Sequence, residues 1–264
     1  MESKEEVLKK IKLKNEKLTA NVSDPITNKV LKYSIVNEMT LWRAQTLFTK
    51  EPITIEWIRS FENKKVFFDI GANVGMYSVF AALNNNVNVY AFEPESNNFQ
   101  TLMLNIDQNN LSDIVTPFPI GLSNKTELSK LQISKFEAGS SHHTVGKDLL
   151  DHKNLEVISS NFSQGIFSTT LDDLCFKWAL PIPTYLKIDV DGIESKIIEE
   201  SKKTLSSDEL RSVLIEINEN REQDNSIIKT LIQTGFSFDE KQVNEARRKS
   251  GPHQGYAEYL FIKK

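Results

Sequence analysis

The order of apolar and polar positions indicates a strand, a tight turn and a helix in succession. The run Val66–Ile70 is rich in β-favouring residues and stops at Gly71, as expected of a buried strand. A second glycine, Gly75, precedes the apolar stretch 76–83, whose composition favours a helix. Such a unit is typical of a site for a nucleotide-like ligand at the carboxyl edge of a parallel sheet. We expect Gly71 to permit the sharp turn and Gly75 to let helix and ligand approach closely.

Similar apolar runs recur along the chain and predict a seven-stranded sheet. The predicted strands are 66–70, 87–93, 113–120, 184–189, 211–217, 236–238 and 259–262. Proline disfavours a central position, so Pro117 and Pro119 are consistent with an edge position for the third strand. Helical spacing lies between strands at 96–110, 193–205 and 227–232. The alternation predicts an α/β, doubly wound, Rossmann-like sheet whose final hairpin makes the last strand antiparallel.

The chain is expected to divide into an N-terminal helical cap or lid segment, residues 1–60, and a main domain, residues 61–264. The first segment is expected to contain helices at 7–18, 30–48 and 53–61 and a turn at 21–25. The first helix is also compatible with a membrane surface. Its acids offset its lysines, however, which favours packing on the domain or on a partner.

Composition limits the class of protein. A chain of 264 residues with 39% hydrophobic content can bury one large core. The net charge of −4 and the pI near 5.7 disfavour a general nucleic-acid surface. A single cysteine, Cys175, excludes an internal disulfide and a cysteine-based zinc cluster.

The N-terminal composition bears on location. Residues 1–18 are rich in lysine and glutamate and lack the apolar core of a signal peptide. No apolar run approaches the ~20 residues that a membrane-spanning helix needs. We therefore expect a cytoplasmic protein without a transmembrane segment.

The glycine spacing distinguishes two ligands. A dinucleotide site is expected to show G-x-G-x-x-G, whereas this chain has Gly71-x-Asn73-x-Gly75 and no third glycine. Asp69, two residues before Gly71, suits a ligand with an ammonium group and no pyrophosphate, such as S-adenosylmethionine. Glu93 lies 22 positions after Gly71 at the second strand end, where a carboxylate can accept both ribose hydroxyls. The alternative is a β-α-β unit that binds no ligand.

Five segments together resemble a known family. They are DIGANVGMYS, AFEPESNNFQTLMLNI, STTLDDL, YLKIDVDGIESKII and LIEIN. In this order, over roughly residues 43–240, they resemble the FkbM-type methyltransferases. The resemblance implies a class I methyltransferase fold, S-adenosylmethionine as cofactor, and methyl transfer commonly to a sugar or polyketide hydroxyl. Two positions depart from the family pattern: Asp191 stands where Glu is usual, and Ile193 stands where Ala or Phe usually follows the glycine.

The expected cofactor contacts follow the order of the strands. The methionine end should meet the first turn, the ribose the end of the second strand, and the adenine the end of the third. The expected contacts are Asp69, Gly71, Asn73, Gly75, Glu93, Pro94, Gly121, Leu122 and Asp189.

An insertion at about residues 125–168 is longer than a helix crossover requires. Apolar residues at 128–133 suggest an extra strand, residues 137–143 a polar loop, and residues 157–167 another extended segment. We expect this insertion, with the segment around Trp42, to shape a pocket for the methyl acceptor. It carries adjacent histidines, His142 and His143, which on a strand would point in opposite directions.

The carboxyl end of the fourth strand is the expected place of chemistry. Asp189 is the first candidate for a general base, Asp191 the second, and Glu216 a third carboxylate nearby; His142 and His143 are further candidates. Crowded carboxylates raise one another's pKa, which suits a base near neutrality. Asp189 and Glu216 are alternatively candidate ligands of Mg²⁺ or Ca²⁺. The same acids are also compatible with an ion-pair network around Lys187 and a helix cap.

Three functions compete. The first is an O-methyltransferase acting on a hydroxyl of a sugar (in a surface polysaccharide, glycolipid or nucleotide-sugar) or of a secondary metabolite. The second is an NAD(P)-dependent oxidoreductase, and the third a non-catalytic nucleotide-binding domain. The expected partner is a small-molecule or glycan acceptor rather than nucleic acid, and a homo-oligomer is compatible with the sequence.

Overall fold

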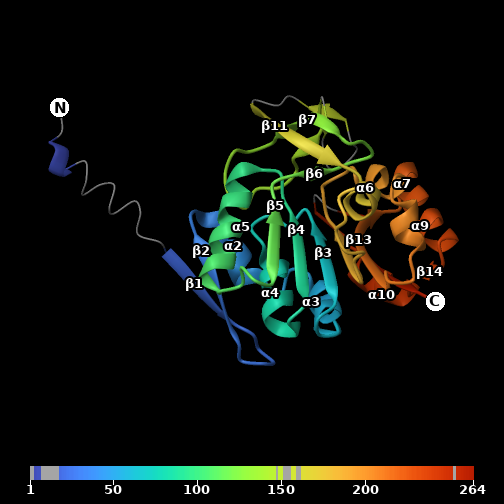
Figure 1. Cartoon of the computed structure of the whole chain (residues 1–264), viewed down its shortest axis with the longest axis horizontal. Coiled ribbons are helices and arrows are strands. Elements are labelled where there is room, and N and C mark those ends of the chain that lie inside the picture. Colours follow the sequence, from blue (N-terminus) through green and yellow to red (C-terminus); the bar gives the residue numbers. More distant parts are fainter. Residues whose placement is uncertain (1–2, 7–17, 147, 151–155, 159–161, 252–253) are drawn as a thin grey trace.

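A seven-stranded sheet forms the middle of the molecule in the computed structural model, which describes residues 3–6, 18–146, 148–150, 156–158, 162–251 and 254–264 (Figure 1). The strand order is β14 (Phe236–Ser237), β15 (Tyr256–Lys263), β13 (Ser212–Asn218), β12 (Tyr185–Ile188), β3 (Val66–Ile70), β4 (Asn88–Phe92) and β5 (Val115–Phe118). Only β15 runs antiparallel to its neighbours in this sheet. The predicted class I sheet, its edge position for the third strand and its antiparallel last strand are confirmed.

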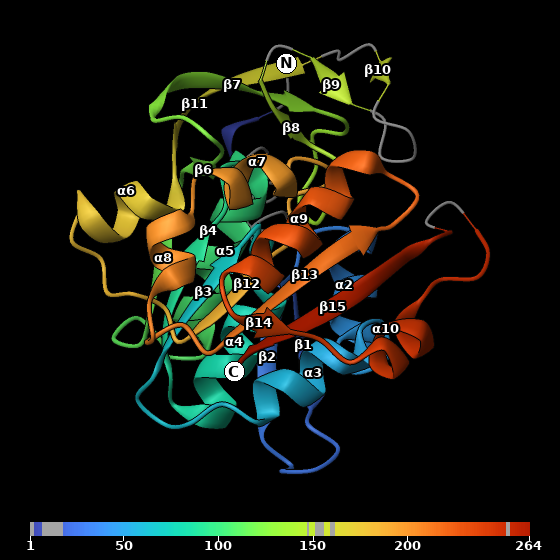
Figure 2. The ribbon, with the colours of Figure 1, turned by 90° about the vertical axis from the view of Figure 1, so that its right-hand side faces the viewer.

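Helices cover both faces of the sheet, as in a doubly wound fold (Figures 1 and 2). One apolar cluster contains residues of α3 (Pro52–Arg59), α4 (Met76–Asn85) and α5 (Ser96–Gln108). The other contains residues of α6 (Leu171–Phe176), α7 (Glu194–Glu199), α8 (Lys202–Ser206), α9 (Glu222–Gln233) and α10 (Glu240–Ala246). Because the sheet is buried on both sides, its central strands are apolar at nearly every position.

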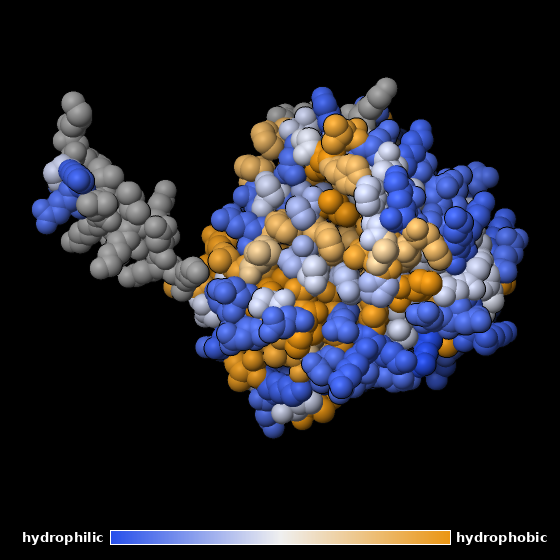
Figure 3. Space-filling model, in the orientation of Figure 1, coloured by the Kyte–Doolittle hydropathy of each residue, from blue (hydrophilic) through white to orange (hydrophobic). Residues whose placement is uncertain are grey.

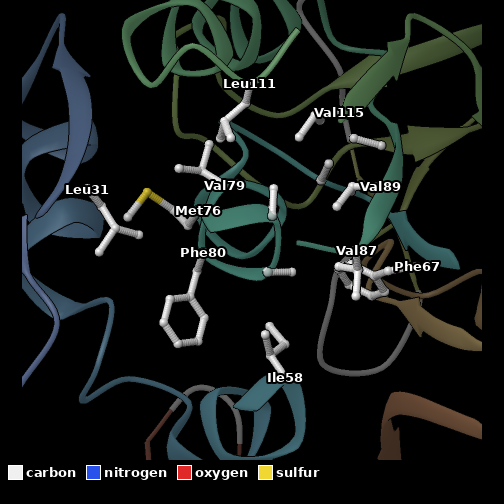
Figure 4. Packing of buried hydrophobic residues seen from close by; sticks show 14 of the residues in the cluster. Leu31, Ile58, Phe67, Met76, Val79, Phe80, Val87, Val89, Leu111 and Val115 are labelled. Carbon is white, nitrogen blue, oxygen red and sulfur yellow. The ribbon is translucent and has the colours of Figure 1, made fainter. Parts of the chain in front are cut away.

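Adjacent residues of β3 illustrate the two cores. Phe67 packs in the first cluster with Val79 and Phe80 of α4, as Figure 4 shows from close by, whereas Phe68 packs in the second. Both phenylalanines are completely buried. Each such side chain contributes about 1.5–3 kcal/mol relative to exposure, so the position of β3 is fixed from both faces.

The N-terminal segment differs from the expectation. Residues Leu18–Ser23 (β1) and Val30–Ile35 (β2) form an antiparallel hairpin, and helix α2 (Glu38–Thr46) begins only at the Asn37 capping box. The expected helix at 30–48 is therefore wrong for its first eight residues. Leu31 and Tyr33 are buried at alternate positions, which is the period of a strand.

Several hydrogen bonds attach this hairpin to the main domain, and two of them are buried. The Tyr33 hydroxyl donates to the Met76 carbonyl at 3.0 Å, and the Asn105 side chain accepts from the Ser34 amide at 2.7 Å. The expected helix at 7–18 lies almost wholly outside the described residues, and the expected turn falls a little later, at residues 25–27. Helix α3 covers Pro52–Arg59, so it begins one residue before the expected range 53–61 and ends two residues before the end of that range.

The insertion forms a second sheet above the carboxyl ends of the central strands (Figures 1 and 2). Its strand order is β6 (Gly121–Leu122), β11 (Phe162–Thr169), β7 (Glu127–Ile133) and β8 (Thr144–Val145). The short strands β9 (Leu149–Leu150) and β10 (Val157–Ile158) form a separate pair. The extra strand and the extended segment expected from the sequence are thus confirmed, and we call the four-stranded sheet the lid sheet.

The surface is mixed in character. Hydrophilic residues dominate the rim of the face drawn in Figure 3, while hydrophobic residues gather over its middle and left. In the part of the chain that the structure describes, no helix combines the length and apolar character needed to cross a bilayer.

Gly75, for which a ligand contact is predicted, has a packing role. It precedes α4 with φ of +80°, and a Cβ at this position would lie 2.3 Å from Leu102 Cδ1. The glycine therefore allows the start of α4 to lie directly against α5. Left-handed backbone and close approach both require the absence of a side chain here.

We expect Gly75→Ala to lower the free energy of unfolding by about 2–4 kcal/mol, because left-handed strain adds to overpacking. Urea denaturation measures this loss. Gly165→Ala is the matched control, since a Cβ there meets nothing within 4 Å and the backbone is not left-handed. In a Leu102→Ala background the added Cβ no longer meets the leucine side chain. There Gly75→Ala should lower the free energy of unfolding only by the part that comes from left-handed strain, measured against Leu102→Ala alone. Equal stability of the two glycine variants would contradict this explanation.

Candidate active site

Three adjoining cavities lie around the carboxyl ends of β3 and β12. Cavity A, of about 520 Å³, extends from these strand ends to the lid sheet. Its lining includes Gly71, Asn73, Glu93, Pro94, Gly121, Leu122, Ser140, His143, Asp189 and Asp191. Cavity B, of about 420 Å³, lies under α2 and includes Arg43, Lys50, Gly71, Asn73, Tyr77, Lys187 and Asp189. Cavity C, of about 230 Å³, includes Glu51, Thr54, Lys187, Asp189, Glu216 and Glu258.

Shared residues connect the three cavities. Gly71 and Asn73 line both A and B, and Lys187 lines both B and C. Asp189 lines all three. The cavities therefore form one branched site whose branches meet at the end of β12.

Gly71 makes this junction possible. Its φ is +80°, its amide donates to the Phe92 carbonyl at 3.0 Å, and a Cβ would lie 1.9 Å from the Asp189 carbonyl oxygen. No other residue type fits so close to a neighbouring backbone. The role expected for Gly71 in the sharp turn is confirmed by this geometry.

Glu93 presents a fixed carboxylate to cavity A. Its two oxygens accept from the amides of Asn73 and Glu95, each at 2.8 Å. Burial raises the pKa of Glu93 to about 7, although these two hydrogen bonds oppose the rise. A carboxylate held in this way can accept two further donors from a ligand.

The remaining wall of cavity A is mainly apolar. Pro94 and Leu122 line it from the central domain, and Leu131 and Val145 line it from the lid sheet. Gly121 lies between these two sides, because a Cβ there would meet Ile166, Val145 and Pro94. The end of the third strand thus contributes to the cavity where the sequence predicted it.

Asp69 lies below the cavities rather than in their walls. It is 1% exposed and accepts from the Ser78 hydroxyl at 2.5 Å. Burial raises the pKa of Asp69, while the charge of Lys187 opposes the rise. Asp69, for which a ligand contact is predicted, thus makes this hydrogen bond inside the fold.

Asp189 differs in charge state from the expectation. Lys187, itself 3% exposed, places its Nζ 2.8 Å from Asp189 Oδ2. Burial alone would raise the pKa of Asp189, but Lys187 and then Lys50 hold it well below the ordinary value. The prediction that crowding would raise this pKa is therefore wrong, because the buried ammonium outweighs the neighbouring acids. The ion-pair network around Lys187, left open as an alternative, is present.

Cavity C contains two carboxylates whose pKa is raised, Glu216 and Glu258. Burial and the charge of Asp189 raise the pKa of Glu216 well above its ordinary value, even though Arg248 lies 2.7 Å away and opposes the rise. Burial and then Glu51 raise the pKa of Glu258 to about 8. Glu216 and Glu258 face each other directly across the β13–β15 ladder. Of the three acids expected as proton acceptors, Asp189, Asp191 and Glu216, Glu216 is the one whose pKa is raised.

The predicted metal ligands do not form a cation site. Among the described residues, no group of three histidine, cysteine, aspartate or glutamate side chains is placed to hold a metal ion. Asp189 is paired with Lys187, and Glu216 with Arg248. These donors therefore do not fit Mg²⁺ or Ca²⁺, which take six or more oxygen ligands.

The loop 138–143 of the insertion closes over cavities A and B. The Asn73 side chain donates to the Ser140 carbonyl at 2.7 Å, and Arg43 Nε donates to the Gly139 carbonyl at 2.7 Å. Both donors also line cavity B. The insertion is thus attached to the site by residues of the site itself.

The two adjacent histidines have different partners. His142 has a left-handed φ of 64°; its amide donates to Asp191 Oδ2 at 2.7 Å, and its Nδ1 lies 3.2 Å from Asp191 Oδ1. His143 lines cavity A, and its Nδ1 accepts from the Ser134 amide at 3.2 Å. Burial would raise the pKa of Asp191, but His142 holds it below the ordinary value. His142 and Asp191 therefore act as a pair that fixes the loop.

Several residues of cavities B and C did not stand out in the sequence. Lys50, Glu51 and Thr54 looked like the start of a helix. Glu258 gave one usable signal, which is a charged residue inside the otherwise apolar run of the last strand. The pairing register that brings it opposite Glu216 could not be read from the sequence.

We expect the two histidines to titrate on opposite sides of 6.5 in an NMR pH titration. The hydrogen bond to Asp191 raises the pKa of His142, whereas burial lowers that of His143. The stability that the His142–Asp191 pair contributes is present below the unfolded pKa and lost as pH rises through the folded one. Asp191→Asn should lower the pKa of His142 more than that of His143, because the hydrogen bond to Asp191 is the largest influence on His142 whereas burial is the largest on His143. A His142 that titrates below His143 would contradict the pairing.

Solved methyltransferases resemble this fold. The Methyltransferase FkbM of Methylobacillus flagellatus KT has a TM-score of 0.48 at 15% identity, covering 86% of this chain and 55% of that one. The chain thus spans just over half the length of that solved protein. Precorrin-6y C5,15-methyltransferase of Geobacter metallireducens GS-15 has a TM-score of 0.47 at 14% identity, covering 83% and 92%.

Sequence comparison gives the family. Hexuronic acid methyltransferase AglP of Haloferax volcanii is 23% identical over 208 residues, which is 79% of each chain. The model of the Methyltransferase FkbM domain matches residues 69–240, nearly two thirds of the chain. Those residues run from the first glycine turn to beyond β14, so they include most of the branched site. The chain therefore belongs to the FkbM family of S-adenosylmethionine-dependent methyltransferases.

Proposed function

We propose that this chain transfers the methyl group of S-adenosylmethionine to a hydroxyl of a sugar or a sugar-like metabolite. The observation that carries the proposal is the junction of the three cavities at Asp189. S-adenosylmethionine carries its positive sulfonium between an uncharged adenosine end and a zwitterionic methionine end. An ionised carboxylate at the junction of the cavities suits that central positive charge.

The adenosine end is assigned to cavity A. Both ribose hydroxyls can donate to Glu93, whose oxygens are already oriented by two amides. The adenine ring would lie between Leu122 and Pro94 on one side and the lid sheet on the other. Apolar walls with few oriented polar groups are typical of cofactor sites.

The methionine end is assigned to cavity B. Arg43 lies in its wall and brings positive charge for the carboxylate, while Lys50 in the same wall is already paired with Glu51. The ammonium and the sulfonium would lie toward Asp189, where Gly71 allows close approach to the backbone. This arrangement directs the methyl group away from A and toward the remaining branch of the site.

The sugar acceptor is supported by one relative. The methyltransferase of Haloferax volcanii is named for a hexuronic acid and is similar over 79% of this chain. The net charge of −4 supports the prediction that nucleic acid is not the acceptor. A tRNA or rRNA fragment is nevertheless a useful competitor in an activity screen, because transfer to RNA would refute the proposed acceptor class.

The function is tested by binding and by transfer. Calorimetry should detect binding of S-adenosylhomocysteine and no binding of NAD or NADP. This result separates a methyltransferase from an oxidoreductase. Labelled S-adenosylmethionine should then label neutral or acidic monosaccharide glycosides, detected by mass spectrometry as a gain of one methyl group at oxygen. A protein that binds NAD instead, or that methylates only amines, would refute the proposal.

We expect Glu93→Gln to weaken S-adenosylhomocysteine binding by about 10- to 150-fold, because a hydrogen bond to a charged group contributes about 1.5–3 kcal/mol. The pH dependence is a second readout. The pKa of Glu93 is about 7 in the ligand-free protein, so wild-type affinity should rise from pH 6 to pH 8 as the carboxylate ionises. The variant should lose this rise.

Glu127→Gln is the matched control for Glu93→Gln, because Glu127 is exposed at the start of β7. It should bind S-adenosylhomocysteine as the wild type does at every pH. Wild-type affinity and pH dependence in the Glu93 variant would show that the ribose lies elsewhere.

A further inference from the structure

Cavity C contains a polar atom that the assignment of the cofactor leaves unused. Thr54 is completely buried in α3 and lines the cavity. Within the part of the chain that the structure describes, its hydroxyl oxygen has no hydrogen-bond partner. A buried hydroxyl without a partner destabilises the fold, so its presence here needs an explanation outside the ligand-free protein.

The charges around the same cavity are nearly all paired. Lys187 pairs with Asp189 at 2.8 Å, and Arg248 pairs with Glu216 at 2.7 Å. Lys50, at the edge, pairs with the adjacent Glu51. The fourth carboxylate, Glu258, lies 3.9 Å from the same Arg248 atom. Carboxylates therefore outnumber cations around the described lining of C, and each of these cations already has a carboxylate partner.

We propose that cavity C is the acceptor subsite and that it takes the hydroxyl-bearing edge of an uncharged sugar. Thr54 contacts one hydroxyl, and Glu216 receives the proton of the reacting one. This inference rests on the proposed methyl transfer and adds to it the place, the proton acceptor and the charge of the acceptor.

The position of the cavity supports this role. C meets cavity B at Lys187 and Asp189, beside which the proposed function places the sulfonium. Its enclosed part has room for one group about the size of a water molecule, such as a single hydroxyl. The cavity therefore receives only the reacting edge of a sugar, with the rest of the ring at its mouth.

The reaction step is an in-line displacement. The acceptor oxygen forms a bond to the methyl carbon while the bond from that carbon to sulfur breaks, and its electron pair stays on sulfur as the neutral thioether. The hydroxyl proton passes to the Glu216 carboxylate. Neither an oxidant nor a further reactant is needed.

The paired charges determine which acceptors fit. Above the pKa of Glu258, about 8, and once Glu216 has lost its proton, a carboxylated sugar would add a negative charge beside these two carboxylates, and the cations there are already engaged. A neutral sugar adds no charge, and its hydroxyls can donate to these oxygens. Preference for a neutral over a uronic acceptor would distinguish this chain from the hexuronic acid methyltransferase that it resembles.

The base role implies a pH dependence. Glu216 is faced by Asp189 and Asp191 beyond β12, by Glu51 before α3, by Glu258 of β15 and by Arg248. The carboxylates disfavour its ionisation, and Arg248 favours it. Turnover should therefore rise as pH increases through the range in which Glu216 loses its proton.

The first experiment uses Thr54→Val, which removes the hydroxyl and keeps the shape. We expect an unchanged or higher Tm, at least a tenfold higher KM for the sugar acceptor, and unchanged affinity for S-adenosylhomocysteine. Thr230→Val on α9, remote from C, is the control and should change neither KM nor affinity. A Thr54 variant with wild-type acceptor KM would overturn the inference, and so would one with a lower Tm, because the hydroxyl would then have a structural role.

The second experiment tests Glu216 and acceptor charge. Saturation-transfer NMR is measured on the full chain with S-adenosylhomocysteine bound. The signal of methyl α-D-glucopyranoside, galactopyranoside or mannopyranoside should be at least tenfold stronger than the signal of the matching uronate. Glu216→Gln should retain sugar binding, lower kcat at least 100-fold and lose the rise of kcat with pH. Glu245→Gln, exposed on α10, is the control.

The outcomes separate the two proposals. A chain that fails to bind S-adenosylhomocysteine would refute the proposed function itself. If the protein binds S-adenosylhomocysteine but prefers uronates or binds none of these sugars, only the acceptor subsite is overturned. The same holds if the Glu216→Gln variant turns over normally.

Discussion

The buried ion pair between Lys187 and Asp189 is the interaction on which the site depends. Lys187 is 3% exposed in the middle strand of the sheet, where its neighbours are apolar. Asp69, Asp189 and Glu51 all raise its pKa, although burial alone would lower it. An ammonium among several acids keeps a carboxylate ionised in a place where desolvation would otherwise neutralise it. The ionised group at the junction of the cavities exists because this lysine lies beneath it.

The same pair divides the acids of the site into two groups. Near Lys187, Asp189 is held ionised. Farther along the sheet, Glu216 and Glu258 have raised pKa values, because burial and neighbouring negative charge outweigh a single shared arginine. One end of the site is therefore suited to a permanent positive charge, and the other to proton exchange. Such a division is how closely spaced carboxylates take different roles.

The sequence predicted the parts of the molecule that depend on neighbours in the chain. The β3–α4 unit and the carboxylate of Glu93 follow from local pattern, and both lie where they were expected. The hairpin at Leu31 and Tyr33 was missed because alternation over six residues was read as part of a longer helical run. The charge state of Asp189 and the pairing of Glu216 with Glu258 depend on register and burial. Neither is encoded in local spacing.

Asn73 shows why this glycine turn differs from a dinucleotide motif. Its φ is 51°, a conformation that glycine adopts without strain and asparagine tolerates. In return the amide side chain accepts from Val74 at 2.9 Å and donates to the Ser140 carbonyl at 2.7 Å, while its backbone amide orients Glu93. A glycine would keep only the last of these contacts. The asparagine thus joins the carboxylate of cavity A to the loop that closes over it, and the strain at this position is offset by that connection.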